Sequence, residues 1–289
     1  MIVITKPKEM TRAARRERTL LRQVGLVPTL GYLHEGHEAL IKRAKKENGL
    51  VVVSQFVNPL QFRAKAYRDY PRDFDRDMTV CERLGVDYLF SPEAEDMYPE
   101  GFDTSVEVKD MAGRLEGASI RWHYRAVTTV VAKLFNIVQP DTAYFGRKDP
   151  HQLAIIKRMA EDLNFPVKII SVETRRAKDG LALSSRNSLL SGEERKAAAV
   201  ISKAQKAIET RIKRGEKNWR KLASGLAAMI EKEPLAEVDY AAVVDADTLR
   251  DEVTSDSVLI YSAVYIGGKR LTDNRVVKIP SGARSGRRA

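Results

Sequence analysis

Val27-Pro28-Thr29-Leu30-Gly31-Tyr32-Leu33-His34-Glu35-Gly36-His37 is the stretch from which the fold can be read. Before it, residues 25–27 are typical of the end of a short apolar strand, which Pro28 and Gly31 break. After it, the apolar spacing of residues 38–44 predicts an amphipathic helix. A strand, a turn and a helix start together form an anion site, because free backbone N–H groups and the positive end of the helix dipole meet there.

The two histidines of this stretch, His34 and His37, are three residues apart, so both imidazoles can point to one side of the helix start. Imidazole N–H groups donate hydrogen bonds to phosphate, and phosphate binding is the hypothesis that we favour. A zinc site is an alternative, but zinc needs a third and usually a fourth ligand, for which His123, His151 and Cys81 are the candidates. A purely structural histidine pair is the third interpretation.

The composition of the chain bounds its class. Its 289 residues, 43% of them hydrophobic and 31% charged, are enough for two domains with buried cores. No apolar run is long enough to span a bilayer, the N-terminus does not read as a signal peptide, and a single cysteine fits a reducing compartment, so we expect a cytoplasmic protein without membrane contact. The net charge of +11 is spread along the chain without an interleaved aromatic platform, and a nucleic-acid partner is not expected.

The order of the elements predicts an α/β fold. The strand before His34, its helix, and the β-branched run 50–57 form a right-handed parallel unit, as in a Rossmann-like sheet. Further strands are expected at 2–4, 86–90, 105–108, 142–145 and 167–172, with helices at 9–22, 75–84 and 128–138, and with a helix that follows the stretch 146–152 and runs on to 163. Ligands bind at the carboxyl ends of parallel strands, so Asn58 and Gln61 should share a rim with His34, unless they are only a turn former and a surface amide.

A second junction between a strand and a helix carries Gly146, Lys148 and Asp149. Lysine offers a point charge to phosphate, and aspartate can accept from ribose hydroxyls or hold a hydrated Mg²⁺. The alternative is an ordinary helix N-terminus, where the dipole favours an aspartate. A lone histidine such as His123 can be structural, but its neighbours Arg121 and Arg125 favour a role in which it faces an anion.

The character of the chain changes near residue 174. We expect an N-terminal Rossmann-like domain over 1–174 and a smaller α+β domain over 175–289 that acts as a lid, with a disordered tail at 281–289. Ser184, Ser185 and Arg186 can wrap a triphosphate, or can simply cap the helix that follows. That second domain is expected to be helical from 191 to about 232, with Ser191 and Glu194 as the helix cap, and to have strands at 238–244, 258–266 and 276–279.

With these pieces in place, the chain resembles the pantothenate synthetase (pantoate–β-alanine ligase) family of the HxGH nucleotidylyltransferase superfamily. The matching stretches follow the family's order along almost the whole chain. They are 28–37, 56–62, 70–72, 129–140, 145–152, 179–187 and 270–274. The resemblance implies that ATP and pantoate form a pantoyl-adenylate with release of pyrophosphate, and that β-alanine then displaces AMP to give pantothenate. It also implies Mg²⁺ bound through the ATP phosphates, no metal site of the protein's own, and a homodimer.

The resemblance assigns roles residue by residue. His37, His34, Lys148 and Arg186 are expected to be catalytic. ATP is expected to contact Leu30, Gly31, His34, His37, Gly146, Lys148, Asp149, Arg175, Leu183, Ser184, Ser185 and Arg186. Pantoate and β-alanine are expected to contact Gln61, Asn58, Gln152, His123 and Tyr70.

Several positions depart from the family pattern. Leu30 replaces a methionine, Arg147 a glutamate, and Arg175 an apolar residue beside the adenine. Pro150 and His151 replace an aromatic residue and a glutamine. The segment 120–126 keeps the histidine but not its turn, and 63–66 is basic and one residue short. The alternatives are therefore a weakened or repurposed homologue with another acyl-adenylate-forming or nucleotidylyltransferase activity, or a nucleotide- or RNA-binding protein.

Overall fold

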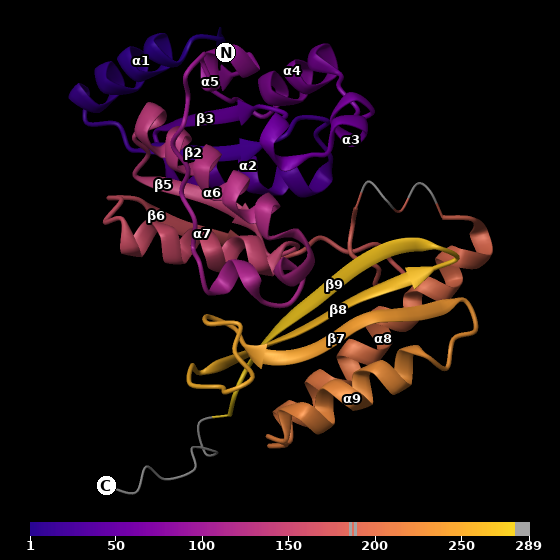
Figure 1. Cartoon of the computed structure of the whole chain (residues 1–289). Helices are drawn as coiled ribbons and strands as arrows, with labels where there is room; N and C mark the ends of the chain where they lie inside the picture. The colour runs from indigo at the N-terminus through magenta and orange to yellow at the C-terminus, as the bar shows by residue number, and fades with distance from the viewer. Residues whose placement is uncertain (185–186, 188–189, 281–289) are drawn as a thin grey trace, which may run out of the picture. The chain divides into compact units, whose positions relative to one another are not determined.

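The structure, a computed structural model, describes residues 1–184, 187 and 190–280, and of Ser119 only the backbone (Figure 1). The tail 281–289, expected to be disordered, lies outside the described residues. The chain divides into two compact units, Met1–Glu173 and Thr174–Ala289. Each unit has a sheet and a hydrophobic core of its own.

The sheet of the first unit has six parallel strands in the order β1-β4-β3-β2-β5-β6. The strands are β1 (Ile2–Ile4), β2 (Val24–Thr29), β3 (Leu50–Gln55), β4 (Tyr88–Phe90), β5 (Thr142–Gly146) and β6 (Lys168–Val172). The order reverses between β2 and β5, which makes this a doubly wound α/β sheet. The α/β class expected from the sequence is confirmed.

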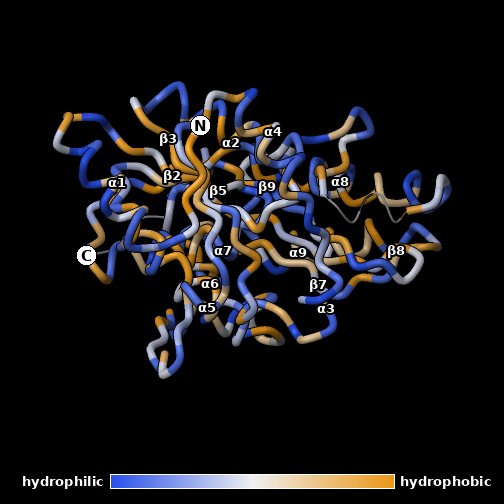
Figure 2. The backbone as a smooth tube through the Cα atoms, turned by 90° about the horizontal axis from the view of Figure 1, so that it is seen from above, coloured by the Kyte–Doolittle hydropathy of each residue, from blue (hydrophilic) through white to orange (hydrophobic). Residues whose placement is uncertain are grey.

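Helices cover both faces of this sheet, because alternate strand residues point to opposite sides. Leu26 packs with α1 (Pro7–Thr19), α6 (Gly117–Val138) and α7 (Pro150–Asp162). Val27, the next residue, packs with α2 (Glu35–Glu47) and α4 (Phe74–Arg83) on the other face. A strand buried on both faces is apolar throughout, and Figure 2 shows β2 and β3 as largely orange segments of the tube.

The first unit also contains short helices, and one strand that the sequence predicted is absent from it. The short helices are η1 (Pro59–Gln61), α3 (Ala64–Arg68), α5 (Ala94–Met97) and η2 (Met111–Gly113). The strand expected at 105–108 is absent: Val106 N–H donates to Thr129 Oγ1, and its carbonyl accepts from Thr128 Oγ1. Its backbone therefore pairs with side chains of α6 instead of a neighbouring strand.

The helix α6 is longer than the sequence indicated. It begins at Gly117 instead of near Thr128. The segment 120–126, which departs from the family pattern, therefore lies within this helix, and Ile120 has non-helical backbone angles. This extension places His123 on α6.

The second unit packs α8 (Gly192–Lys213) and α9 (Trp219–Ile230) against an antiparallel sheet in the order β7-β8-β9. The strands are β7 (Ala236–Asp245), β8 (Ser257–Ile266) and β9 (Lys269–Lys278). The expected cap is confirmed, since Ser191 accepts from Glu194 N–H and Glu194 accepts from Ser191 N–H. The last strand begins at Lys269 instead of residue 276, because Gly267-Gly268 forms a tight hairpin that pairs Ile266 with Lys269.

Candidate active site

A pocket of about 190 Å³ opens at the carboxyl rim of the parallel sheet in the first unit. It lies where β2, β3 and β5 end, at the reversal of strand order, as expected for ligand sites of open α/β sheets. Its polar lining is formed by Thr29, His37, Gln61, Tyr70, Asp149 and Gln152. Its apolar lining is formed by Pro28, Leu30, Phe56, Val127, Val130, Val131, Leu134 and Phe145. The site residues expected at Leu30, His37, Gln61, Tyr70, Asp149 and Gln152 therefore come together around one cavity.

Both histidines of the opening motif belong to the start of α2. His34 is the N-cap residue, and its Nδ1 accepts from Gly36 N–H at 3.0 Å. His37 Nδ1 accepts from His34 N–H at 3.3 Å, and the two ring centroids are 4.1 Å apart. The sequence prediction that the two rings share one side of the helix start is confirmed.

These contacts decide which nitrogen of each ring carries the proton. A backbone N–H can only donate, so both Nδ1 atoms are acceptors and both rings have their proton on Nε2. Burial, and secondly the neighbouring His34, lowers the pKa of His37 to about 3. Burial, and secondly the Arg76 charge, lowers the pKa of His34. The pair is therefore two neutral imidazoles that each offer an Nε2–H donor.

The anion site itself is built differently from the one expected. Five N–H groups of the turn and of the start of α2, which were expected to meet a ligand, have internal acceptors. Gly31 N–H donates to Thr29 Oγ1, Tyr32 and Leu33 N–H to the Asp77 carboxylate, and His34 and Gly36 N–H to imidazole nitrogens. The prediction of free backbone donors is wrong for these five residues, and the imidazole Nε2–H groups are the side-chain donors that this helix start offers to a phosphate.

Of the two neighbouring amides expected to bind substrate, Gln61 faces the pocket and Asn58 supports it from behind. Gln61 lines the pocket, whereas Asn58 is completely buried behind it and is not part of the wall. Asn58 Nδ2 donates to Gln61 Oε1 at 2.9 Å, and Asn58 Oδ1 accepts from Leu60 N–H and from Tyr98 OH. Asn58 is thus a helix cap that also orients Gln61, whose amide NH₂ is the end available to a ligand.

His123 also lies outside the pocket lining. Its Nδ1 is 3.0 Å from the Gln61 carbonyl oxygen, so it contacts the backbone of the residue that faces the cavity. Arg121 pairs with Glu107 and with the Lys109 carbonyl. These contacts account for one ring nitrogen of His123 and for Arg121, and the anion-facing role expected of His123 stays a prediction.

The β5–α7 junction brings a cation and a carboxylate to the same rim. Asp149 is the N-cap residue of α7 and makes no capping bond; its side chain is exposed on the pocket, and Lys148 Nζ is 3.4 Å from its Oδ1. Arg147 turns to β6, where it donates to Ser171 Oγ and pairs with Glu173. The added positive charge of Arg147 is therefore balanced by Glu173.

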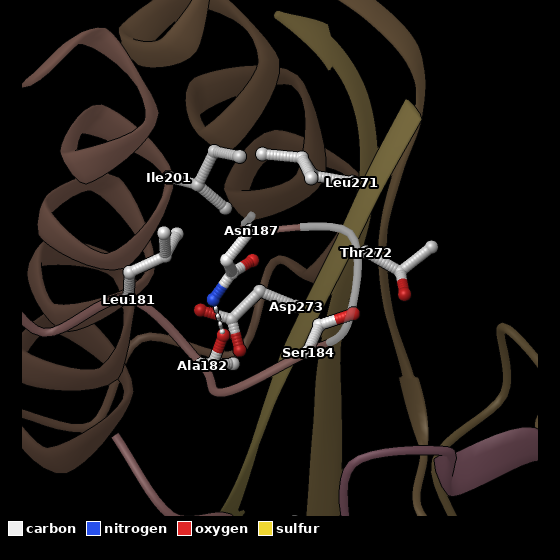
Figure 3. Close-up of a pocket in the computed structure, with 8 residues that line it drawn as sticks. All are labelled: Leu181, Ala182, Ser184, Asn187, Ile201, Leu271, Thr272 and Asp273. Atoms are coloured by element: carbon white, nitrogen blue, oxygen red, sulfur yellow. Dashed lines mark hydrogen bonds between the residues drawn. The ribbon is translucent and has the colours of Figure 1, made fainter. Parts of the chain in front are cut away.

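In the second unit, residues 175–183 form a hairpin in which Leu183 N–H donates to the Arg175 carbonyl. Arg176 holds this hairpin to β9 through a bidentate pair with Asp273 at 2.7 and 2.9 Å. Ser184 and Asp273 face a small cavity, where Asn187 donates to the Ala182 carbonyl (Figure 3). Ser185 and Arg186, expected on the phosphates, lie outside the described residues.

Comparison with known proteins decides the family. The family model of pantoate-beta-alanine ligase matches residues 2–276. The chain belongs to the pantoate-beta-alanine ligase family. The pantothenate synthetase of Heliobacterium modesticaldum is 48% identical over 281 residues, which cover 96% of this chain and 100% of that protein. The resemblance inferred from the sequence is confirmed.

Solved structures of the family share the fold. A pantothenate synthetase structure from Thermus thermophilus matches with a TM-score of 0.85 and 42% identity, covering 95% of this chain and 99% of that one. The pantoate-beta-alanine ligase of Francisella tularensis, solved with beta-gamma ATP and beta-alanine, matches with a TM-score of 0.74 and 34% identity, covering 96% and 97%.

The described residues contain neither a membrane-spanning helix nor a cluster of metal-binding side chains. No helix in residues 1–184 and 190–280 is both long and apolar enough to cross a membrane. Within the same ranges, His, Cys, Asp and Glu side chains do not group in threes as a metal site requires. The zinc alternative for the histidine pair therefore finds no third ligand among these residues.

Sequence reasoning missed Asp77, whose carboxylate accepts from the N–H groups of Tyr32 and Leu33. These residues belong to the turn 31–33 that precedes His34, which we call the histidine turn. Asp77 is fully buried on α4, and Cys81, one turn later on the same face, is buried too. An acidic residue in phase with the apolar face of a predicted helix was the signal that could have found it.

Proposed function

We propose that this chain condenses pantoate with β-alanine to pantothenate, using ATP and forming a pantoyl-adenylate. A pantoate carboxylate oxygen attacks the α-phosphorus of ATP and pyrophosphate leaves; the β-alanine amine then attacks the acyl carbon and AMP leaves. Family membership supports this amide-forming ligase over the other acyl-adenylate former and the binding protein. The single observation that carries the site is the pocket itself, where donors for phosphate and for pantoate converge.

The histidines and Lys148 are proposed to serve the phosphates. Two neutral Nε2–H donors can follow the charge that moves from the attacking carboxylate to the leaving pyrophosphate, and they need no proton transfer to do so. Lys148 supplies the positive charge that these neutral rings do not. Gly146 and Asp149 are proposed to hold the ribose, with Leu30 and Gly31 beside the nucleotide.

The opposite wall fits pantoate. The amide NH₂ of Gln61 can donate to its carboxylate or hydroxyl oxygens, and Gln152 and Tyr70 add polar groups. The valines of α6 offer the apolar surface that the two methyl groups of pantoate need. Asn58 and His123 are proposed to act through Gln61, by fixing its side chain and its backbone.

The second unit is proposed to act on the nucleotide as a lid. The family resemblance supports contacts from Arg175, Leu183 and Ser184, and from Ser185 and Arg186, which lie outside the described residues. Positioning and charge neutralisation are sufficient for this chemistry, so a covalent nucleophile is not needed.

Mg²⁺ is proposed to arrive with ATP. Among the described residues, His, Cys, Asp and Glu side chains do not group in threes, which fits an ion held by the phosphate oxygens of ATP. When bound, the ion would neutralise phosphate charge. A homodimer is proposed from the family resemblance. A cytoplasmic location is proposed because the buried free thiol of Cys81 is compatible with a reducing compartment.

Pyrophosphate release from MgATP tests this function. We expect release to require pantoate, pantothenate to appear only when β-alanine is added, and both to be lost in His37→Ala. Release that ignores pantoate, or no release despite measurable ATP binding, would contradict the ligase. Light scattering during gel filtration tests the dimer.

A further inference from the structure

The carboxylate of Asp77 is the internal anion of the histidine turn. Its Oδ1 accepts from Leu33 N–H at 2.7 Å, and its Oδ2 accepts from Tyr32 N–H at 2.6 Å and from Gln55 Nε2 at 2.9 Å. Two successive N–H groups of a turn form a concavity that favours an anion. Here a side chain of the protein occupies that concavity, so the turn does not depend on a ligand for its shape.

The turn that Asp77 holds is unfavourable by itself. Gly31 has φ +81° and Tyr32 has φ +51°, and the left-handed region is strained for a residue with a side chain such as tyrosine. A Cβ at Gly31 would lie 3.0 Å from Gln55 Nε2 and 3.2 Å from Asp77 Oδ2. The turn is therefore closed over these two side chains, and it needs them to stay in this conformation.

Arg76 contacts the same turn through a hydrogen bond and a cation–π interaction. Its Nη2 donates to the Leu33 carbonyl at 3.0 Å, and its guanidinium lies 4.9 Å from the centre of the Tyr32 ring. Consecutive residues of α4 thus bind both polar groups of Leu33 and the side chain of Tyr32. This leaves the turn little freedom to shift relative to α4.

The turn connects two parts of the proposed site. Leu30 on the pocket wall precedes it, and His34, the cap of α2, follows it directly. The same α4 is preceded in sequence by Tyr70, which also lines the pocket. A shift of the turn would therefore move the histidines relative to the substrate wall.

We propose that Asp77 is a positioning residue of the ligase site, holding the left-handed turn at Gly31–Tyr32 so that the Nε2–H groups of His34 and His37 stay aimed at the reacting phosphates. The proposal rests on the proposed function. Asp77 touches neither the pocket nor a reacting atom; it acts through the backbone of Tyr32 and Leu33.

Asp77→Asn tests this role, with Asp73→Asn as the matched control. Both substitutions remove one carboxylate charge from the start of α4, but Asp73 is exposed and caps the helix by accepting from Arg76 N–H instead of from the turn. An asparagine at 73 can still cap the helix. An asparagine at 77 would place its NH₂ group, which can only donate, opposite N–H groups that also donate. We expect Asp77→Asn to lower kcat about 30-fold, since small misplacements of catalytic groups are costly, with KM for ATP and pantoate changed by less than about 3-fold.

Hydrogen exchange gives a readout that does not depend on activity. In Asp77→Asn, backbone exchange over residues 31–36 should become at least about tenfold faster, while exchange in the β3 core stays as in the wild type. Asp73→Asn should match the wild type in both measurements. Equal kcat and equal exchange in the two variants would overturn the proposal.

A second variant covers the case in which Asp77→Asn does not fold. Arg76 is exposed, so Arg76→Ala should leave the fold intact. It removes the hydrogen bond to the Leu33 carbonyl and the contact with the Tyr32 ring. Faster exchange at 31–36 with a lower kcat would support the proposal, and behaviour identical to Asp73→Asn would overturn it. A wild-type protein without pantoate-dependent pyrophosphate release would instead refute the proposed function, and the exchange result would still stand by itself.

Discussion

Asn58 Nδ2 donates to Gln61 Oε1 across 2.9 Å, and this bond determines which end of the Gln61 amide faces the pocket. The direction follows from Leu60 N–H, which can only donate and therefore fixes Asn58 Oδ1 as the acceptor. A fully buried residue thus sets the hydrogen-bonding character of the pocket wall.

Removing this support should damage pantoate binding more than ATP binding. In Asn58→Ala, Gln61 can rotate and the Tyr98 hydroxyl loses its acceptor, so we expect KM for pantoate to rise about tenfold, equivalent to ~1.4 kcal/mol, and stability to fall by about 2 kcal/mol. Steady-state kinetics and urea unfolding measure the two effects. Tyr98→Phe is the control, because it keeps the Asn58–Gln61 bond. An unchanged KM for pantoate in Asn58→Ala would show that Gln61 is oriented by other contacts.

The protonation of the histidine pair can be observed directly. At pH 7, ¹⁵N spectra of histidine-labelled protein should show unprotonated Nδ1 and protonated Nε2 for both His34 and His37, because backbone N–H groups occupy both Nδ1 atoms. A proton on either Nδ1 would refute this assignment.

The same tautomer predicts an order of activity among substitutions. His37→Gln can place an amide donor near the Nε2 position, whereas His37→Asn reaches only the Nδ1 position. We expect His37→Asn to lose about 100-fold or more in kcat, as for the loss of a preorganised donor, and His37→Gln to lose several-fold less. Equal kcat in the two variants would mean that Nε2 does not carry the contact.

Acid should destabilise the folded protein through this pair. The pKa of His37 is lowered from 6.5 to about 3, so between these values the unfolded chain binds a proton that the folded chain does not. Stability therefore falls as pH falls below 6.5, by at most ~1.4 kcal/mol per pH unit for this one residue. Urea unfolding at pH 7.5 and 5.5 should show a smaller loss in His37→Gln than in the wild type. The same loss in both proteins would contradict the buried, neutral imidazole.

The first residue of α6 should tolerate no side chain. A Cβ at Gly117 would collide with the Ala112 carbonyl oxygen and lie 2.8 Å from Cε1 of the buried His151. We expect Gly117→Ala to destabilise the protein by about 2 kcal/mol or more, because a backbone atom blocks relaxation. Gly113→Ala is the matched control, since a Cβ there meets nothing within 4 Å. Similar unfolding free energies for both variants would show that the start of α6 can shift.

What the sequence determined is local or periodic. The alternation of apolar runs with helical patterns predicted the parallel sheet, and the strand–turn–helix pattern around His34 and His37 predicted where its ligand rim lies, since parallel strands place their carboxyl ends at one edge. The breadth of the matching motifs determined the family. Even the cap at Ser191 and Glu194 followed from spacing alone, because both partners lie within one turn of helix.

What only the tertiary structure decided are contacts between residues far apart in the chain. The N–H groups of the histidine turn were expected to be free, but Asp77, 45 residues from Tyr32 along the chain, accepts two of them. Asn58 was expected on the pocket wall, but packing against Tyr98 and Ala126 buries it behind Gln61. A buried polar group must find a partner, and which partner it finds depends on the packing of distant segments, which residue spacing does not encode.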